Sequence, residues 1–289
     1  MPNTAADFSL LAQRAVAVLE RIEAWLPALP VAPDWDRHIA FRWRRRGERA
    51  WLEGIARPQA ITATQLTGID TQKQLITQNT AQFVAAKPAN NVLLTGARGT
   101  GKSSLVKAML PAFAAQGLRM IEVDKDHLAD LADIAAQLEQ RPERFILFCD
   151  DLSFAEDDAG YKSLKVALDG TLAAPPDNVL VYATSNRRHL LPEYLRENEA
   201  TRHRDGEIHP HEATEEKISL SERFGLWLSF YPFDQETYLA SVALWLEAYG
   251  VNPLTGDIRR EALQWALTRG NRSGRSAWQF ARDYAGRQN

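Results

Sequence analysis

The chain has 289 residues, of which 45% are hydrophobic, and a formal net charge of −3. It can bury a sizeable core, and its slightly acidic balance excludes a protein held on nucleic acid by overall charge. No apolar run approaches the ~20 residues that span a bilayer, and the first thirty residues lack the features of a secretion signal. A single cysteine, Cys149, rules out an internal disulfide. From the lack of a membrane-length run and of a secretion signal we expect a cytoplasmic protein without a membrane partner.

The N-terminal region, residues 1–60, is predicted to be helical. Apolar side chains recur at helical spacing over residues 8–26, and that helix is ended by Pro27, Pro30 and Pro33. A second helix is predicted over residues 36–55, where Glu48 and Glu53 lie beside the basic run Arg42-Trp43-Arg44-Arg45-Arg46 and Arg49. Such a run can contact nucleic acid or a membrane surface. In an acidic protein, however, a solvated helix face or a docking surface is the preferred interpretation.

From residue 91 onward strands and helices alternate, which predicts a parallel sheet covered by helices on both faces. Five strands are predicted, at residues 91–95, 118–124, 144–150, 178–184 and 226–231. Helices between them are predicted at residues 101–116, 127–140, 160–173 and 212–224. Three further helices follow at residues 234–249, 259–269 and 274–286. An α/β domain (61–232) is therefore expected to precede a small helical domain (233–289).

One segment has the pattern G-x-x-x-x-G-K-[ST], namely Gly96-Ala97-Arg98-Gly99-Thr100-Gly101-Lys102-Ser103. It lies between an apolar run and an amphipathic stretch that begins at Ser104. Glycines let backbone amides turn inward around an anion, and the following helix adds the positive end of its dipole. Lys102 would bring a charge to the β- and γ-phosphates, and Ser103 a hydroxyl to Mg²⁺. The segment therefore predicts a site for a nucleoside triphosphate and Mg²⁺.

A second motif is the buried strand 145–149, which ends in Asp150 and Asp151. At the carboxyl end of its strand, Asp150 can hold a Mg²⁺-bound water, and Asp151 can orient or deprotonate the water that attacks the γ-phosphorus. Paired acids also cap helices, and Ser153 nearby fits that alternative. Because a phosphate loop lies upstream, we prefer the catalytic interpretation.

Three further polar or basic side chains stand at the ends of predicted elements. Asn186 follows the fourth strand, where an amide can position water, although Asn is also an ordinary turn former. Arg223 precedes the fifth strand, and Arg272 and Arg275 stand at the start of the last helix. Arginine stays charged and binds phosphate oxygens through two parallel hydrogen bonds, yet any one of these arginines alone would more often form a surface ion pair.

In this order the motifs resemble those of the AAA+ ATPases over nearly all of residues 65–289. The resemblance implies that residues 96–103, with Ser104, form Walker A, and that Asp150 and Asp151 form Walker B. It further implies that Asn186 is sensor 1, Arg223 the arginine finger and Arg275 sensor 2 of a helical lid, with Arg272 as the alternative. The family's Gly-Ile or Gly-Val pair beside adenine is matched by Gly68 and Ile69.

Within that superfamily the sequence is most similar to a bacterial group of predicted ATPases of unknown function and, more distantly, to helicase-loader ATPases. The segments that carry this likeness are the phosphate loop and Asp150-Asp151-Leu152-Ser153-Phe154, Ser185-Asn186-Arg187-Arg188-His189-Leu190 and Leu220-Ser221-Glu222-Arg223-Phe224-Gly225-Leu226-Trp227. Many active members have Glu as the second Walker B acid. Asp151 is one methylene shorter, which implies slow turnover or a differently positioned water.

Two functions follow from these motifs. One is an ATPase that uses ATP and Mg²⁺ to change its assembly or its grip on an unknown protein client, with an arginine donated within a homo-oligomer. The alternative is an ATP-switched loader or adaptor with little hydrolysis, including one that acts on nucleic-acid machinery. Asp151 favours the alternative over a polypeptide-threading machine, as does Lys125-Asp126-His127-Leu128 where an aromatic-Gly pore loop would stand.

Other functions are disfavoured. A small-molecule kinase does not explain the arginines near residues 223 and 275, and GTP does not fit because no Asn-Lys-x-Asp element follows the fourth strand. A metal site is conceivable at His203, His209 and His211, but a solvated loop is the preferred interpretation of this charged segment.

Overall fold

The computed structural model describes residues 11–19, 21, 32–154, 159–170, 174–186, 222–251 and 255–288. The chain divides into two units, Met1–Pro33 and Asp34–Asn289. In the first unit, residues 11–19 are helical and expose apolar side chains, including Leu11 and Leu19. Among the described residues, no helix has both the length and the hydropathy required to cross a membrane.

A seven-stranded sheet forms the centre of the second unit, with the order β2-β1-β4-β5-β6-β3-β7. Its neighbouring strands are parallel except for the pair β1 and β2. All five predicted strands are present, and the two additional strands come from the N-terminal region. The strands are β1 (Ala40–Arg46), β2 (Arg49–Gly54), β3 (Val92–Gly96), β4 (Leu118–Glu122), β5 (Arg144–Cys149), β6 (Val179–Ser185) and β7 (Leu226–Phe230).

The helix predicted over residues 36–55 is wrong, because these residues form the hairpin of β1 and β2. Side chains alternate along β1 with the period of a strand: Phe41 and Trp43 are 0% and 2% exposed, whereas Arg42 and Arg44 point to the other face. Gly47 has φ +59° and lies between the two strands, where a tight turn favours glycine. Because most residues from 42 to 49 are charged, the alternation of buried and exposed side chains is hard to recognise in the sequence.

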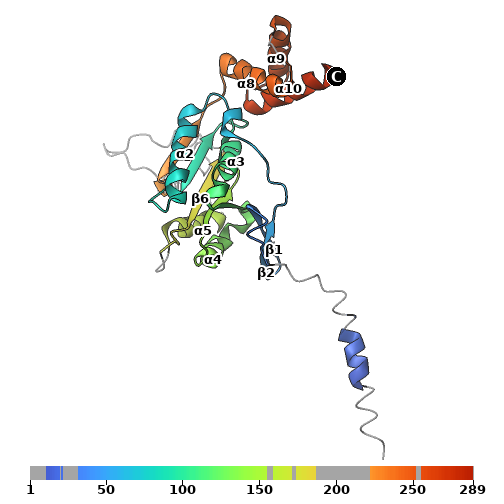
Figure 1. Ribbon diagram of the computed structural model, residues 1–289, viewed down its shortest axis with the longest axis vertical. Helices are drawn as coiled ribbons and strands as arrows, with labels where there is room; N and C mark the ends of the chain where they lie inside the picture. Colours follow the sequence, from blue (N-terminus) through green and yellow to red (C-terminus); the bar gives the residue numbers. More distant parts are fainter. Residues whose placement is uncertain are drawn as a thin grey trace, which may run out of the picture. The chain divides into compact units, whose positions relative to one another are not determined.

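Helices cover both faces of the sheet (Figure 1). Strand β5 shows why: Phe145 and Leu147 pack in one core, and Ile146 and Phe148 in the core on the opposite face. The first core is covered by η3 (Lys125–Asp130), α4 (Leu131–Leu138) and α5 (Ala159–Asp169), and the second by α2 (Asp70–Val84) and α3 (Lys102–Phe113). The short helices η1 (Ala63–Gln65) and η2 (Ala114–Gln116) flank α2 and α3 in the chain. The helix predicted at 212–224 lies almost wholly outside the described residues.

The C-terminal region contains the three predicted helices, α8 (Gln235–Ala248), α9 (Gly256–Thr268) and α10 (Gly274–Gln288). Side chains of Asp234 and Thr255 cap the first two by accepting backbone hydrogen bonds from Thr237 and Ile258. The helices pack around a core of their own, whose largest fully buried side chains are Tyr238 and Phe280. They form a small bundle that follows β7 (Figure 1).

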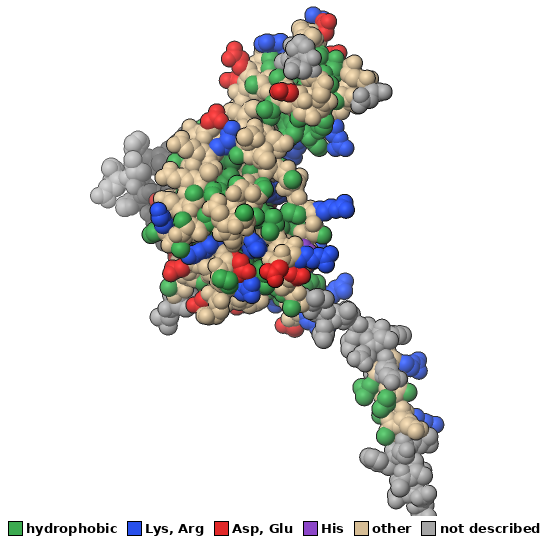
Figure 2. All heavy atoms as spheres, viewed as in Figure 1, with side chains coloured by type: hydrophobic (Ala, Val, Ile, Leu, Met, Phe, Trp, Pro, Cys, Tyr) green, Lys and Arg blue, Asp and Glu red, His purple; other side chains and the backbone are tan. Residues whose placement is uncertain are grey.

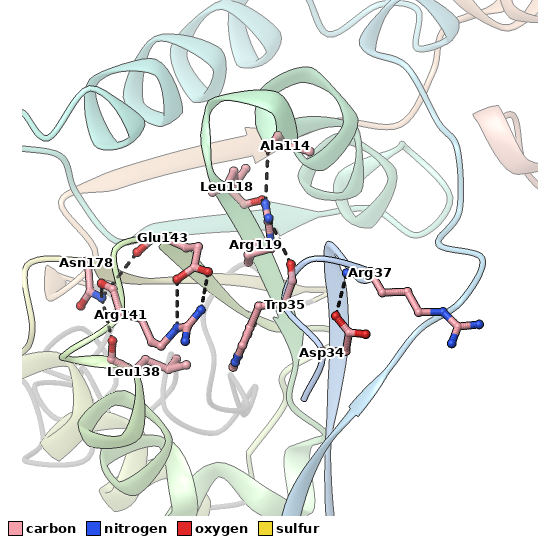
Figure 3. Close-up of polar contacts among 10 residues, drawn as sticks. All are labelled: Asp34, Trp35, Arg37, Ala114, Leu118, Arg119, Leu138, Arg141, Glu143 and Asn178. Atoms are coloured by element: carbon pink, nitrogen blue, oxygen red, sulfur yellow. Dashed lines mark hydrogen bonds and ion pairs between the residues drawn. The ribbon is translucent and has the colours of Figure 1, made fainter. Parts of the chain in front are cut away.

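The start of the second unit is anchored beside β4 and β5 (Figure 3). Arg119 donates from Nη2 to the carbonyl of Trp35 at 3.2 Å. From Nη1 it donates to the carbonyls of Leu118, in β4, and of Ala114, the first residue of η2. The guanidinium of Arg141 lies 5.1 Å from the ring centre of Trp35. These contacts hold the segment that leads into β1 against the sheet.

Candidate functional site

The phosphate loop joins β3 to α3 at the carboxyl edge of the sheet. Gly96, Gly99 and Gly101 have positive φ angles of 125°, 74° and 100°. A Cβ atom on Gly96 would lie 1.9 Å from the carbonyl oxygen of Phe230, so only glycine fits beside β7. The loop and its strand-to-helix context are those predicted from the sequence.

Lys102 lies across this loop and is only 5% exposed. Its Nζ donates to the carbonyls of Gly96 and Ala97, both at 2.7 Å, and to Oδ1 of Asn186 at 3.0 Å. Burial lowers the pKa of Lys102 to about 8, and the nearby carboxylates of Asp151 and Asp150 oppose this shift. The ammonium is therefore held in place by neutral oxygens within the loop.

Asp150 accepts three hydrogen bonds at one carboxylate oxygen. Its Oδ1 receives Ser103 Oγ and Thr184 Oγ1, each at 2.6 Å, and the backbone N of Asp151 at 3.1 Å. The structure thus brings together Ser103 and Asp150, the two residues predicted to serve Mg²⁺. No motif marks Thr184, whose signal in the sequence is a hydroxyl near the end of a largely apolar strand that adjoins β5.

Asp151 and Asn186 also meet. Asn186 donates from Nδ2 to Oδ1 of Asp151, so Asn186 links Lys102 to Asp151 across the ends of β3, β5 and β6. Asp151 has φ +52°, which is unusual for a residue other than glycine and costs on the order of 1–2 kcal/mol. Backbone strain of this kind is typical of functional sites.

A cavity of about 810 Å³ opens beside these residues. Its lining combines the loop, Asp150, Asp151, Thr184 and Asn186 with Gln59, Ile61, Gln65, Leu66, Thr67, Phe233, Trp245 and Trp278. Among the described residues, Thr67 Oγ1 on this lining is buried without a hydrogen-bond partner, so a bound ligand could satisfy it. The volume and the mixed polar and aromatic lining suit a nucleotide.

The predicted pair Gly68 and Ile69 lies next to this cavity but is not part of its lining. Ile69 is 4% exposed, and its Cδ1 would lie 3.7 Å from a Cβ on Gly101, as would Leu66 Cδ2. A Cβ on Gly68 would lie 2.3 Å from Cγ2 of Thr237 in α8. The pair therefore supports the cavity wall, which Leu66 and Thr67 line.

The turn before α10 contacts the phosphate loop. Arg275 N donates to the carbonyl of Gly99 at 3.2 Å, and a Cβ on Gly99 would lie 2.8 Å from Oγ of Ser273. Arg275 lines the cavity, whereas Arg272 does not. Of the two arginines considered for sensor 2, the geometry favours Arg275.

Arg223 is not brought to the phosphate loop of its own chain. It precedes β7, which runs parallel to β3 with Leu226 opposite Val92 and Phe230 opposite Gly96. Because a strand rises about 3.3 Å per residue, β7 alone places more than ~13 Å between Arg223 and the loop. Arg223 Nε donates instead to Oδ2 of Asp169 at the end of α5, at 2.6 Å.

The basic run of β1 is largely engaged in ion pairs. Arg42 Nε donates to Glu122 at 2.7 Å and Arg44 Nε to Glu53 at 2.7 Å, while Arg45 pairs with Asp130. On the face shown in Figure 2, basic and acidic side chains lie close together over the lower part of the second unit. Arg42, Arg44 and Arg45 are therefore paired side chains of strand β1 and do not form a free basic helix face.

Other candidate chemistry finds no support in the described part of the chain. No group of three or more His, Cys, Asp or Glu residues there could hold a metal ion. His203, His209 and His211 lie outside it. Cys149 is fully buried, and burial raises the pKa of its thiol to about 12, so it is an inert strand residue.

A second cavity, of about 750 Å³, lies between α4, α5 and the segment that follows α2. Its lining is mainly apolar and includes Phe83, Leu147 and Val166. None of the residues predicted to bind phosphate or Mg²⁺ lines it, so the candidate site is the cavity at the phosphate loop.

A protein-family model described as "Protein of unknown function (DUF815)" matches residues 36–288. No curated protein matches the sequence significantly. Among solved structures, the chain is similar to the Thermotoga maritima RuvB Holliday junction branch migration motor, with 16% identity, a TM-score of 0.51, and coverage of 76% of this chain and 63% of that chain.

The chain is also similar to the Aeropyrum pernix Orc1 protein, solved in complex with DNA. Here the identity is 17% and the TM-score 0.52, with coverage of 78% of this chain and 62% of that chain. The chain thus spans less than two thirds of the length of both solved proteins. At such low identity the likeness concerns the fold.

Proposed function

Because the chain belongs to the DUF815 family, whose function is unknown, and has the fold of the AAA+ P-loop ATPases, we propose that it binds and hydrolyses Mg-ATP. The observation that carries this proposal is the hydrogen-bonded set at the carboxyl edge of the sheet: Lys102, Asn186, Asp151, Asp150 and Ser103. These residues come from three separate segments and line a cavity that suits a nucleotide. Phosphoryl transfer needs such a set of positioned charges more than it needs covalent chemistry.

The side chains present fit Mg²⁺ and a triphosphate. A hydroxyl (Ser103) and a carboxylate (Asp150) are the hard oxygen groups that Mg²⁺ prefers, usually through retained waters. When bound, Mg²⁺ would neutralise charge on the β- and γ-phosphate oxygens. Lys102 would add its charge from within the loop, and the amides at the start of α3 would face the anion.

The apolar and aromatic part of the cavity lining fits a base. Leu66, Trp245 and Trp278 offer apolar and aromatic surface, and the Thr67 hydroxyl has no partner among the described residues. A purine could stack on such surface and satisfy this hydroxyl. We assign the base as adenine from the resemblance of Gly68 and Ile69 to the AAA+ pattern.

Hydrolysis would require Asp151 and Arg223. Asp151 would orient the attacking water, with Asn186 holding its carboxylate in place. Arg223 lies at the opposite end of β7 and can serve only the site of a neighbouring copy, which makes the active form an oligomer. Through the contact of Arg275 with Gly99, a nucleotide bound at the phosphate loop would change the position of the C-terminal helices and, with it, the affinity for a partner.

The alternative is an ATP-switched loader or adaptor with little turnover. It is favoured by Asp151, which is shorter than the usual glutamate and is already engaged by Asn186. The solved Orc1 structure contains DNA, so nucleic-acid machinery stays among the candidate partners of this chain. The ion pairs along β1 weaken the case for direct DNA binding by that strand.

Calorimetry of the full chain with ATP and Mg²⁺ tests the proposal. We expect wild-type protein to bind ATP with at least ~10-fold preference over GTP. Lys102→Ala should weaken ATP binding at least ~100-fold, because it removes a buried cation that faces the phosphates. A well-folded wild type that takes up no adenine nucleotide would contradict the proposal. Specific ATPase activity that rises with protein concentration would separate the oligomeric ATPase from the switch.

A further inference from the structure

At the carboxyl end of β6, Thr184 holds the turn that follows β5 through several hydrogen bonds, beside one from Ser185 to the Leu152 carbonyl and one from Asn186 to Asp151. Thr184 Oγ1 donates to Oδ1 of Asp150 (2.6 Å) and accepts from the backbone N of Asp151 (2.9 Å). The carbonyl of Thr184 accepts from the backbone N of Leu152 at 2.7 Å. Three successive residues of the turn are thus bound by Thr184, which is only 1% exposed.

The hydroxyl of Thr184 both donates and accepts a hydrogen bond. A threonine hydroxyl has one proton to donate and lone pairs that accept. Here the proton goes to Asp150 and a lone pair to the amide of Asp151, so the same oxygen orients both acids. Ser103 donates to the same carboxylate oxygen, Oδ1. Among the described residues Oδ2 of Asp150 receives no hydrogen bond, which leaves that oxygen for other ligands.

Thr184 also supports the strained backbone of Asp151. A non-glycine residue persists at φ +52° only where its surroundings hold it there. The amide of Asp151 and the amide of Leu152 are both bound by Thr184, one on each side of the strained torsions. In this conformation the Asp151 side chain reaches Asn186.

We propose that Thr184 is a positioning residue: it commits Oδ1 of Asp150 to hydrogen bonds within the protein, so that Oδ2 would be the oxygen available to Mg²⁺, and it holds Asp151 in the conformation in which it would activate water. This inference rests on the proposed ATPase function. Thr184 lines the cavity beside Asp150 and Asp151, but among the described residues it forms no hydrogen bond to Lys102 and it lies outside residues 96–103. Its loss should therefore affect metal binding and turnover while it leaves metal-free nucleotide binding intact.

The test compares three variants in the full chain. Thr184→Val removes the hydroxyl at nearly constant volume, and Thr184→Ser keeps the hydroxyl. Thr80→Val is the matched control, because Thr80 is 0% exposed and, among the described residues, its hydroxyl bonds to the Ile76 carbonyl in α2 and to the Tyr182 hydroxyl in β6. The measurements are ATP affinity with EDTA, Mn²⁺ affinity of the nucleotide complex by electron paramagnetic resonance, and kcat.

For Thr184→Val we expect Mn²⁺ affinity and kcat to fall ~10- to 100-fold, with ATP affinity in EDTA within about twofold of wild type. Thr184→Ser should stay within about threefold of wild type in all three measurements, and Thr80→Val should lower only thermal stability. Should Thr184→Val not fold, Thr184→Cys, with its weak thiol donor, should show the same division between metal-dependent and metal-free readouts.

Wild-type Mn²⁺ affinity and kcat in Thr184→Val would overturn the inference, as would a serine variant as impaired as the valine variant. Equal losses in EDTA and in Mn²⁺ would also overturn it, since they indicate general damage to the site. Absence of ATP binding by the wild type would refute the proposed function itself, and this inference with it.

Discussion

At the carboxyl edge of the sheet, Lys102, Asn186 and Asp151 contact one another within one chain, whereas at the amino end of β7 Arg223 pairs with Asp169 at the end of α5. The first region can be complete in a monomer. The second cannot reach it, because the strands are rigid and β7 separates the two. Binding and hydrolysis are therefore expected to have different requirements for assembly.

The largest effect is expected from Arg223→Ala, which changes only the region at the amino end of β7. Arg223→Ala should lower kcat ~10³-fold, because charge on the γ-phosphate in the transition state is no longer neutralised, while ATP affinity stays within about twofold. Steady-state ATPase assays and calorimetry measure the two quantities. The exposed lid residue Arg260, paired with Asp257 in its own helix, gives a matched Arg260→Ala control that should change neither.

Mixed oligomers sharpen this prediction. Subunits with Lys102→Ala lack a working loop but still carry Arg223, and Arg223→Ala subunits have the reverse defect. Mixing the two inactive variants should restore part of the activity if the arginine acts on a neighbour. No recovery in mixtures that demonstrably co-assemble would refute the assignment of Arg223 as a finger in trans.

The next effect concerns hydrolysis within the first region. Asp151→Asn should reduce turnover ~100-fold, because the amide cannot accept a proton from water, and should retain ATP binding. Single-turnover hydrolysis and calorimetry distinguish the two outcomes. Asp257→Asn, an exposed change in α9, serves as control. Turnover that is already negligible in wild type and unchanged in Asp151→Asn would favour the ATP switch.

A smaller effect is expected where the lid meets the loop. Arg275→Ala should weaken ATP binding ~10-fold, the magnitude of one hydrogen bond to a charged group. Arg272→Ala should change affinity less than about twofold, since Arg272 does not line the cavity. Calorimetry on both variants decides between them, and the reverse ranking would make Arg272 the sensor.

The smallest effect comes from pH. Burial lowers the pKa of Lys102 to about 8 in the free protein, so part of the population is neutral above that pH. A bound triphosphate favours the charged form, so binding above pH 8 must take up a proton. ATP affinity should therefore fall about threefold between pH 7.5 and 8.5. Calorimetry in buffers of different ionisation enthalpy measures this uptake, and a flat profile would contradict the pKa of Lys102.

Local sequence patterns predicted most of the residues around the proposed phosphate site. The loop, its flanking strand and helix, and the acids after β5 are contiguous segments whose residue types reveal their backbone and charge, and the structure places them as expected. Thr184 was missed, since its role depends on β6 lying beside β5 and not on any motif of its own. The hairpin of β1 and β2 was mistaken for a helix, since its alternation is confined to one short strand dense in arginine.

The loop at residues 96–103, the alternation of strands and helices, and the residue types available for phosphate chemistry can be read from the sequence, because each depends on neighbours along the chain. The strand order cannot, and it sets which distant side chains meet: Asn186 with Lys102 and Asp151, Arg275 with the loop, and Arg223 with Asp169. The reason is physical. Contacts between strands depend on how the whole sheet buries its two faces, and no local pattern encodes that order.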